Sequence, residues 1–116
     1  MTFEIKRVYD DPDRGDGVRV LVDRLWPRGV KKASLEMDQW CKDVAPSTEL
    51  RKWFDHIPER FGEFSKRYRA ELKNNDAVAE LLDLGSKGSK VTLLYTAKDP
   101  DNNQAVVLRD FLNEPL

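Results

Sequence analysis

The stretch of sequence that decides the fold is residues 18–25, which read V-R-V-L-V-D-R-L. β-Branched and apolar side chains follow one another here almost without interruption, which is typical of a strand buried on both faces of an α/β sheet. Pro27 and Gly29 then end the run, because proline lacks a backbone N–H and glycine relaxes the backbone. We therefore predict a central strand over residues 18–25 and a loop over residues 26–32 at its carboxyl end.

Other apolar segments extend this predicted sheet. Phe3 and Ile5 alternate with charged residues, which is the period of a strand with one solvated face. Residues 91–96 read V-T-L-L-Y-T and predict a second buried strand. Residues 37–41 fit either an edge strand or an irregular segment.

Four helices are predicted between and after these strands. Ser47 can cap the first, which Pro58 ends, and the second begins at Pro58. Asp76 can cap a third helix that Gly85 closes in a left-handed conformation, and a fourth follows the polar loop 98–102. The spacing of the apolar residues places the following side chains on inward faces: Trp53, Phe54, Phe61, Phe64 and, in the second buried strand, Leu94.

Length and composition set the class of protein. The chain has 116 residues, of which 40% are hydrophobic, and this is enough for one ordinary domain and too little for two. Strands that alternate with loops and helices predict a small single α/β domain over residues 1–116, with helices packed on a mixed or parallel sheet. A net charge of -1 at pH 7 argues against a disordered chain, which usually carries a high net charge.

The same arguments exclude several kinds of site and location. The apolar runs are far shorter than the roughly 20 residues of a membrane span, and residues 1–11 lack the features of a secretory signal, so we expect a cytoplasmic protein without membrane contact. A single cysteine, Cys41, and a single histidine, His56, can build neither an internal disulfide nor a zinc site. We expect no metal or other cofactor, a buried or inert thiol at Cys41, and a role for His56 at a helix end rather than in catalysis.

Charged residues gather in the two loops that follow the two buried strands. Residues 23–29 read D-R-L-W-P-R-G, and residues 98–103 read K-D-P-D-N-N and lead into the last helix. Ligands of open α/β sheets bind outside the carboxyl ends of the strands. If the two buried strands are neighbours, both loops open on the same edge of the sheet and form one site there.

This edge carries residue types that bind anions. Arg24 and Arg28 can pair bidentately with a carboxylate or phosphate, and Lys98 adds positive charge. Asn103 lies at the start of a helix, where unpaired N–H groups favour an anion. Trp26 can stack on a ligand or fill the core. We therefore predict an anionic small molecule as the partner, either a phosphorylated metabolite or a nucleotide.

Two carboxylates of these loops are the candidate catalytic groups if the protein is an enzyme. Asp23 would act as an orienter or general base, and Asp99 would be the second member of the acid/base pair. The alternative is a structural ion network, in which Asp23 pairs with a basic neighbour while Asp99 or Asn102 caps the last helix.

Two other functions would use the same region differently. A nucleic-acid-binding module would contact phosphates through the basic loop, with Arg19, Arg28, Lys31 and Lys32. A sequence pI of about 5.9 disfavours it, since dedicated binders usually have a pI above about 9. An interaction or assembly protein would place Trp26 and Trp40 at a subunit interface.

Several longer motifs point to one family. They are R-V-Y at 7–9, D-G-V-R-V-L-V-D-R-L-W-P-R-G at 16–29, K-D-V-A-P-S at 42–47, L-R-K-W-F-D-H at 50–56, F-S-K-R-Y-R-A-E-L at 64–72, and V-T-L-L-Y-T-A-K-D at 91–99. Over nearly its whole length the chain resembles the YeaO-like branch of the DUF488 group, a prokaryotic family without an assigned function. The resemblance implies a compact α/β domain of bacterial or archaeal origin and supplies no reaction.

The chain departs from the longer members of this group at the positions that carry their cysteines, glutamate and histidine. The residues at those positions here are Tyr95, Ala97, Asn103 and Gln104. The resemblance therefore does not imply thiol-dependent or metal-dependent chemistry for this chain, although Asp23, Lys98 and Asp99 match the shared pattern.

Overall fold

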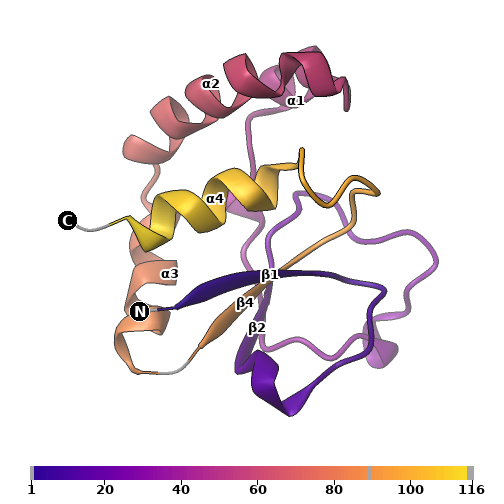
Figure 1. Cartoon of the computed structure of the whole chain (residues 1–116). Coiled ribbons are helices and arrows are strands. Elements are labelled where there is room, and N and C mark those ends of the chain that lie inside the picture. The colour runs from indigo at the N-terminus through magenta and orange to yellow at the C-terminus, as the bar shows by residue number, and fades with distance from the viewer. Residues whose placement is uncertain (1, 89, 115–116) are drawn as a thin grey trace.

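A four-stranded parallel sheet lies at the centre of the protein (Figure 1). The structure is a computed structural model, and it describes residues 2–88 and 90–114. The strands lie in the order β1 (Phe3–Arg7), β4 (Val91–Tyr95), β2 (Val18–Leu21) and β3 (Gln39–Trp40). The predicted α/β fold is confirmed, and the described strands pair in parallel rather than in a mixed sheet.

Strand β2 has the central position predicted for it, because β4 pairs with one of its edges and β3 with the other. It is shorter than predicted. The strand ends at Leu21, and the N–H of Val22 donates a last hydrogen bond to the carbonyl of Leu94 at 3.1 Å. Residues 37–41, for which two structures were possible, contain the two-residue edge strand β3.

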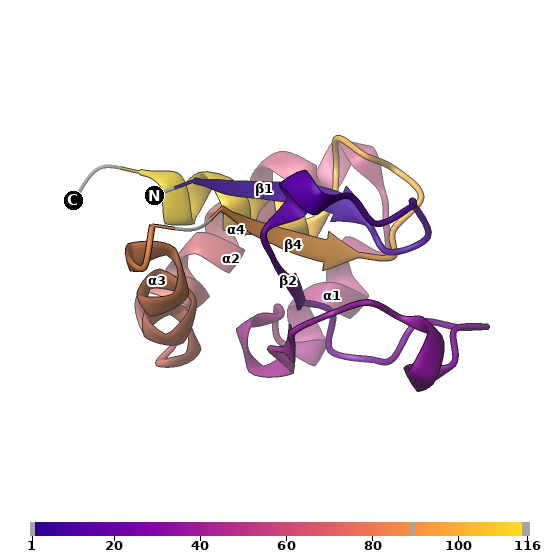
Figure 2. The same cartoon turned by 90° about the horizontal axis from the view of Figure 1, so that it is seen from below.

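Four α-helices pack with the sheet into the main core: α1 (Thr48–Phe54), α2 (Phe61–Lys73), α3 (Ala77–Ser86) and α4 (Gln104–Asn113). Figure 2, seen from below, shows β1, β4 and β2 in front of α1, α2 and α4, which cover one face of the sheet. Val20 and Leu93 of the sheet meet Phe64 and Leu108 of the helices in this core. None of the described helices has the length and apolar character needed to cross a membrane.

The connection between β2 and β3 covers part of the opposite face of the sheet. Leu21 and Leu94 point to this face and pack against Trp26, Leu35, Met37 and Trp40. The rings of Trp26 and Trp40 meet edge to face, with centroids 5.4 Å apart. The two tryptophans therefore belong to a second, smaller core.

The first helix begins as predicted and ends early. The Ser47 hydroxyl accepts a hydrogen bond from the N–H of Leu50 at 3.2 Å, which is the expected N-cap. Helix α1 ends at Phe54, before Pro58, because Asp55 and His56 both adopt a left-handed conformation with φ of 48° and 55°. His56 thus follows the helix end, as predicted.

Asp76 occupies the N-cap position of the third helix as predicted, but the predicted capping hydrogen bond and the predicted end at Gly85 are wrong. Asp76 makes no cap hydrogen bond with its side chain; instead, Asn75 accepts one from the N–H of Ala77 at 2.9 Å. Gly85 lies buried inside α3, and the left-handed residue after the helix is Gly88, with φ of 84°. Glycine is common just after a helix because it tolerates the left-handed conformation. Here the helix continues past Gly85, and Gly88 has that conformation.

The predicted core is confirmed for three of its five members. Phe54, Phe64 and Leu94 are buried, and the rings of Phe54 and Phe64 stack with centroids 4.3 Å apart. Trp53 and Phe61 are half-buried. The guanidinium groups of Arg60 and Arg67 pack over the ring of Trp53 and shield it in part from water.

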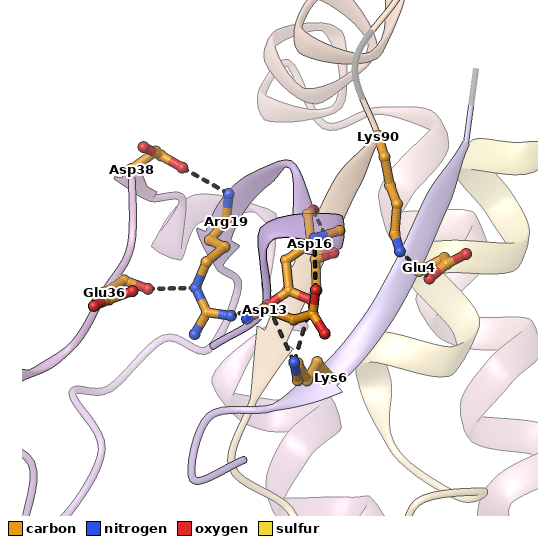
Figure 3. A network of polar contacts seen from close by, with 10 residues as sticks. Glu4, Lys6, Asp13, Asp16, Arg19, Glu36, Asp38 and Lys90 are labelled. Atoms are coloured by element: carbon orange, nitrogen blue, oxygen red, sulfur yellow. Dashed lines mark hydrogen bonds and ion pairs between the residues drawn. The ribbon is translucent and has the colours of Figure 1, made fainter. Parts of the chain in front are cut away.

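A buried ion network joins β1, the turn before β2, and β2 itself (Figure 3). The carboxylate of Asp16 accepts hydrogen bonds from the side chains of Lys6 and Arg19 and from the N–H of Asp13. Arg19 also donates through Nε to the carbonyl of Glu36. Arg19 is therefore buried and held by Asp16 and Glu36, which argues against the phosphate contact predicted for it in a nucleic-acid-binding module.

Candidate functional site

A cavity of about 380 Å³ lies at the carboxyl edge of the sheet. Its walls come from the end of β1, from the segments that follow β1, β2 and β4, from the loop before α1, from α1 and α2, and from the first turn of α4. The pairing of β2 with β4 brings the two predicted loops together, since Leu21 lies opposite Leu94 at the ends of these strands. The floor and walls are apolar at Leu25, Trp26, Pro27, Ala45, Pro46, Phe54, Phe64 and Ala97.

Asp23 joins three elements at the base of this cavity. Its Oδ2 accepts hydrogen bonds from the N–H and the hydroxyl of Thr96, at 3.1 and 2.5 Å, and its Oδ1 accepts one from the side-chain amide of Gln104. Burial raises the pKa of Asp23 above its ordinary value, although these hydrogen bonds and the charge of Arg51 act in the opposite direction. Asp23 holds the ends of β2 and β4 and the start of α4 in fixed positions.

Five cationic side chains line the cavity: Arg7, Arg24, Arg28, Arg51 and Lys98. None of them forms an ion pair with a carboxylate of the residues that the structure describes, whereas Lys6, Arg19, Arg67, Arg69, Lys87, Lys90 and Arg109 do. Among the described lining residues, Asp23 is the single carboxylate. The cavity therefore carries an excess of positive charge in a chain whose net charge is -1.

Two of these arginines are held by backbone carbonyls. Arg7 donates through Nε to the carbonyl of Ala97 at 3.1 Å. Arg24 donates through Nη2 to the carbonyls of Ala45 and Pro46 at 3.4 and 3.3 Å. The Nε of Arg24 is buried and has no hydrogen-bond partner among residues 2–88 and 90–114. Such an unpaired donor normally costs about 1 to 3 kcal/mol.

The structure brings five of the seven predicted site residues to this cavity, namely Asp23, Arg24, Trp26, Arg28 and Lys98. Trp26 is also part of the second core, and its indole N–H donates to the carbonyl of Val30. The tryptophan therefore lines the cavity from a fixed position.

The other two predicted residues, Asp99 and Asn103, do not line the cavity. Asp99 accepts hydrogen bonds from the N–H groups of Asp101 and Asn102 within its own turn, and the side chain of Asn102 lowers its pKa. Asn103 is fully buried, and its Oδ1 caps α4 by accepting from the N–H of Val106 at 3.1 Å. Both side chains shape the loop and the helix start.

Sequence reasoning missed several residues of the cavity, including Arg7, Tyr9, Arg51, Thr96 and Gln104. The segment after the first strand offered a signal for Arg7 and Tyr9, because all parallel strands end at the same edge. The sequence gives no such signal for Arg51, because only the packing of α1 brings this residue to the cavity.

The lone cysteine is buried, and the lone histidine lies at the cavity. Cys41 is buried, and burial raises the pKa of its thiol to about 11. His56 lines the cavity next to the end of α1. Within the described part of the chain, no three His, Cys, Asp or Glu residues lie close enough together to hold a metal ion.

Comparisons with known proteins identify the family. Residues 2–116 match the family described as the inactive DUF488-N3 subclade. An uncharacterized protein of Mycobacterium tuberculosis is 49% identical over 109 residues, which are 94% of this chain and 92% of the relative. The uncharacterized protein YeaO of Escherichia coli is 46% identical over 112 residues, or 97% of each chain. No solved structure matches the chain. By its sequence, the chain belongs to the inactive DUF488-N3 subclade.

Proposed function

We propose that this protein binds an anionic small molecule, either a phosphorylated metabolite or a nucleotide, in the cavity at the carboxyl edge of its sheet. The observation that carries the proposal is the set of five cavity cations without an ion pair to any described carboxylate. Cations that share a partly desolvated cavity repel one another, and a bound anion removes that repulsion. Arginine is suited to this role because its planar fork pairs with phosphate and carboxylate.

Arg24 is the central contact in this proposal. Two backbone carbonyls hold its Nη2, while its Nε has no partner in the described part of the chain. A phosphate in the cavity can pair with the remaining donors of this guanidinium through charge-assisted hydrogen bonds. The start of α4 contributes less, because Asn103 already binds the N–H of Val106.

The site is better suited to binding than to catalysis. A general base needs a lone pair that faces the substrate, and three hydrogen bonds from Thr96 and Gln104 occupy three of the roughly four lone-pair sites of the Asp23 carboxylate. Asp99 points into its own turn and has a lowered pKa, so it is a weak base. The description of the matching family as inactive supports the same conclusion. In this proposal Asp23 orients the loops and takes no proton from the ligand.

A calorimetric or NMR titration with inorganic phosphate and a panel of phosphorylated metabolites and nucleotides tests the proposal. We expect Arg24→Gln and Arg51→Gln to weaken binding about tenfold each, because each removes a charge-assisted contact. Arg109→Gln is the matched control, since Arg109 pairs with Asp110 outside the cavity and should leave affinity unchanged. Equal weakening by all three variants, or no binding of any anion in the panel, would contradict the proposal.

A salt titration separates this function from nucleic-acid binding. A small anion held by a few contacts shows a shallow dependence of affinity on salt, whereas a multi-phosphate footprint gives a logarithmic slope of about -0.9 per phosphate neutralised. Tight binding of an oligonucleotide with a steep slope, lost on mutation of Lys31 and Lys32, would favour the nucleic-acid-binding module instead.

A further inference from the structure

Two large apolar side chains of the described chain are exposed, and both line the cavity. Tyr9 is 46% exposed and Leu25 is 63% exposed. One follows β1 and the other follows β2, so they reach the cavity from separate segments. A single exposed apolar residue needs no explanation, but here both lie beside the same cluster of unpaired cations.

The ring of Tyr9 is fixed at this position. The guanidinium of Arg7 packs against the ring, 4.8 Å from its centroid, and the Tyr9 hydroxyl donates a hydrogen bond to the carbonyl of Arg28 at 3.1 Å. The exposed ring is thus attached to two segments that carry cavity cations. An aromatic ring held in place loses little conformational entropy when a second ring stacks on it.

The size of the cavity limits what can occupy it. About 380 Å³ lies at the lower end of the roughly 300 to 1,000 Å³ typical of small-molecule sites, which suits one compact ligand. A phosphate or a sugar phosphate would engage the cations and leave Tyr9 and Leu25 in water. A ligand with both a phosphate and an aromatic ring would engage the cations and cover both apolar side chains.

We propose that the ligand is an aromatic phosphomonoester of the size of a mononucleotide, with its phosphate on the cavity arginines and its ring against Tyr9 and Leu25. This inference rests on the proposed function, because it names the class of anion that the same cavity takes. The cations supply charge complementarity, and the exposed apolar pair selects for a planar ring.

The test compares probes that differ by one chemical group, namely inorganic phosphate, ribose 5-phosphate, adenosine and AMP. We expect AMP to bind about tenfold or more tightly than ribose 5-phosphate, which is the gain typical of stacking one base on an aromatic side chain. Adenosine should bind more weakly than AMP, because it lacks the group that the arginines hold.

Variants of Tyr9 and Leu25 show whether these two side chains produce the higher affinity for AMP. Tyr9→Ala and Leu25→Ser should each lower the affinity for AMP several-fold more than the affinity for ribose 5-phosphate. Tyr9→Phe keeps the ring and loses only the hydrogen bond to Arg28, so it should retain most of the AMP affinity. Thermal melts of each variant verify that the fold is intact.

The outcomes separate this inference from the proposed function. Equal affinities for AMP and ribose 5-phosphate, both lowered by Arg24→Gln, would overturn the aromatic preference and leave anion binding in place. An AMP affinity that Tyr9→Ala does not change would also overturn it. No binding of phosphate, ribose 5-phosphate or AMP would overturn the proposed function itself.

Discussion

A single carboxylate oxygen of Asp23 accepts two hydrogen bonds from Thr96, one from its N–H at 3.1 Å and one from its hydroxyl at 2.5 Å. Asp23 follows β2 and Thr96 follows β4, so this pair continues the connection between the two strands after their ladder has ended at Leu21 and Leu94. The backbone of both cavity loops starts from this point. Their relative position therefore depends on side-chain hydrogen bonds as much as on the sheet.

Removal of the Thr96 hydroxyl tests this connection. Thr96→Val keeps the shape of the side chain and takes one donor from a buried carboxylate, so we expect it to cost about 1 to 3 kcal/mol of the free energy of unfolding. Thr96→Ser retains the hydroxyl and should be close to the wild type. Urea melts measure both, and equal losses for Val and Ser would show that the hydrogen bond contributes nothing.

The buried Asp16 network leads to a prediction about pH. Desolvation raises the pKa of Asp16, but the hydrogen bonds from Asp13, Lys6 and Arg19 outweigh it, so the pKa lies below its ordinary value of 3.8. The folded state therefore favours the ionised carboxyl more than the unfolded state does. Asp16 adds stability above pH 3.8, and this contribution is lost as the pH falls through its lower folded pKa.

Asp16→Asn should therefore cost about 3 kcal/mol near pH 7, because it leaves Arg19 buried without its carboxylate. The difference between wild type and variant should shrink as the pH falls below 3.8. Asp83→Asn is the control, since Asp83 pairs with Lys87 at the exposed surface and should change stability by less than about 0.5 kcal/mol. A difference that stays constant from pH 7 to pH 3 would contradict the ionic origin of the effect.

The fold and one half of the site could be predicted because they depend on local patterns. The apolar runs at β2 and β4 are strong strand signals, and parallel strands place their following loops at one edge. Asp23, Arg24 and Lys98 were found on this argument alone. The order of the strands could not be predicted in this way. The position of β4 between β1 and β2 is set by contacts between residues far apart in the sequence.

The remaining half of the site depends on packing that no local pattern encodes. Arg51 reaches the cavity because Phe54 of the same helix packs on Phe64 of α2, which sets the position of α1. Whereas Arg51 was missed, Asn103 was predicted as a site residue and does not line the cavity. A polar residue at a helix start was expected to face a ligand, yet its side chain satisfies the N–H of Val106 from a fully buried position. Whether a cap faces inward or outward is decided by tertiary structure.

The packing of α1 on α2 can be tested at the stacked phenylalanines. Phe64 is almost completely buried and stacks on Phe54, so Phe64→Ala should cost about 3 to 5 kcal/mol. Phe61 lies on the same helix and is half-buried, so Phe61→Ala should cost less. The two variants are compared by the midpoints of their urea melts. This comparison requires that the slope of the free energy of unfolding against urea concentration is the same for both. A loss below about 1 kcal/mol for Phe64→Ala would contradict the helix register.

A close approach of two backbone segments leads to the last prediction. Gly17 has φ of 66°, and a Cβ at this position would lie 2.1 Å from the carbonyl oxygen of Lys90. That carbonyl accepts a hydrogen bond from the N–H of Val18 at 2.9 Å, so the backbone cannot move away without breaking the first contact between β2 and β4. Gly17→Ala combines a left-handed alanine with a steric overlap and should cost about 2 to 5 kcal/mol.

Gly29 provides the matched control for this substitution. Its φ of 75° is similar, but a Cβ there would meet no atom within 4 Å, so Gly29→Ala carries only the conformational cost of about 1 to 2 kcal/mol. Thermal or urea unfolding of the two variants therefore separates backbone strain from the overlap with Lys90. Equal losses would show that the segment before β4 yields to the added methyl group.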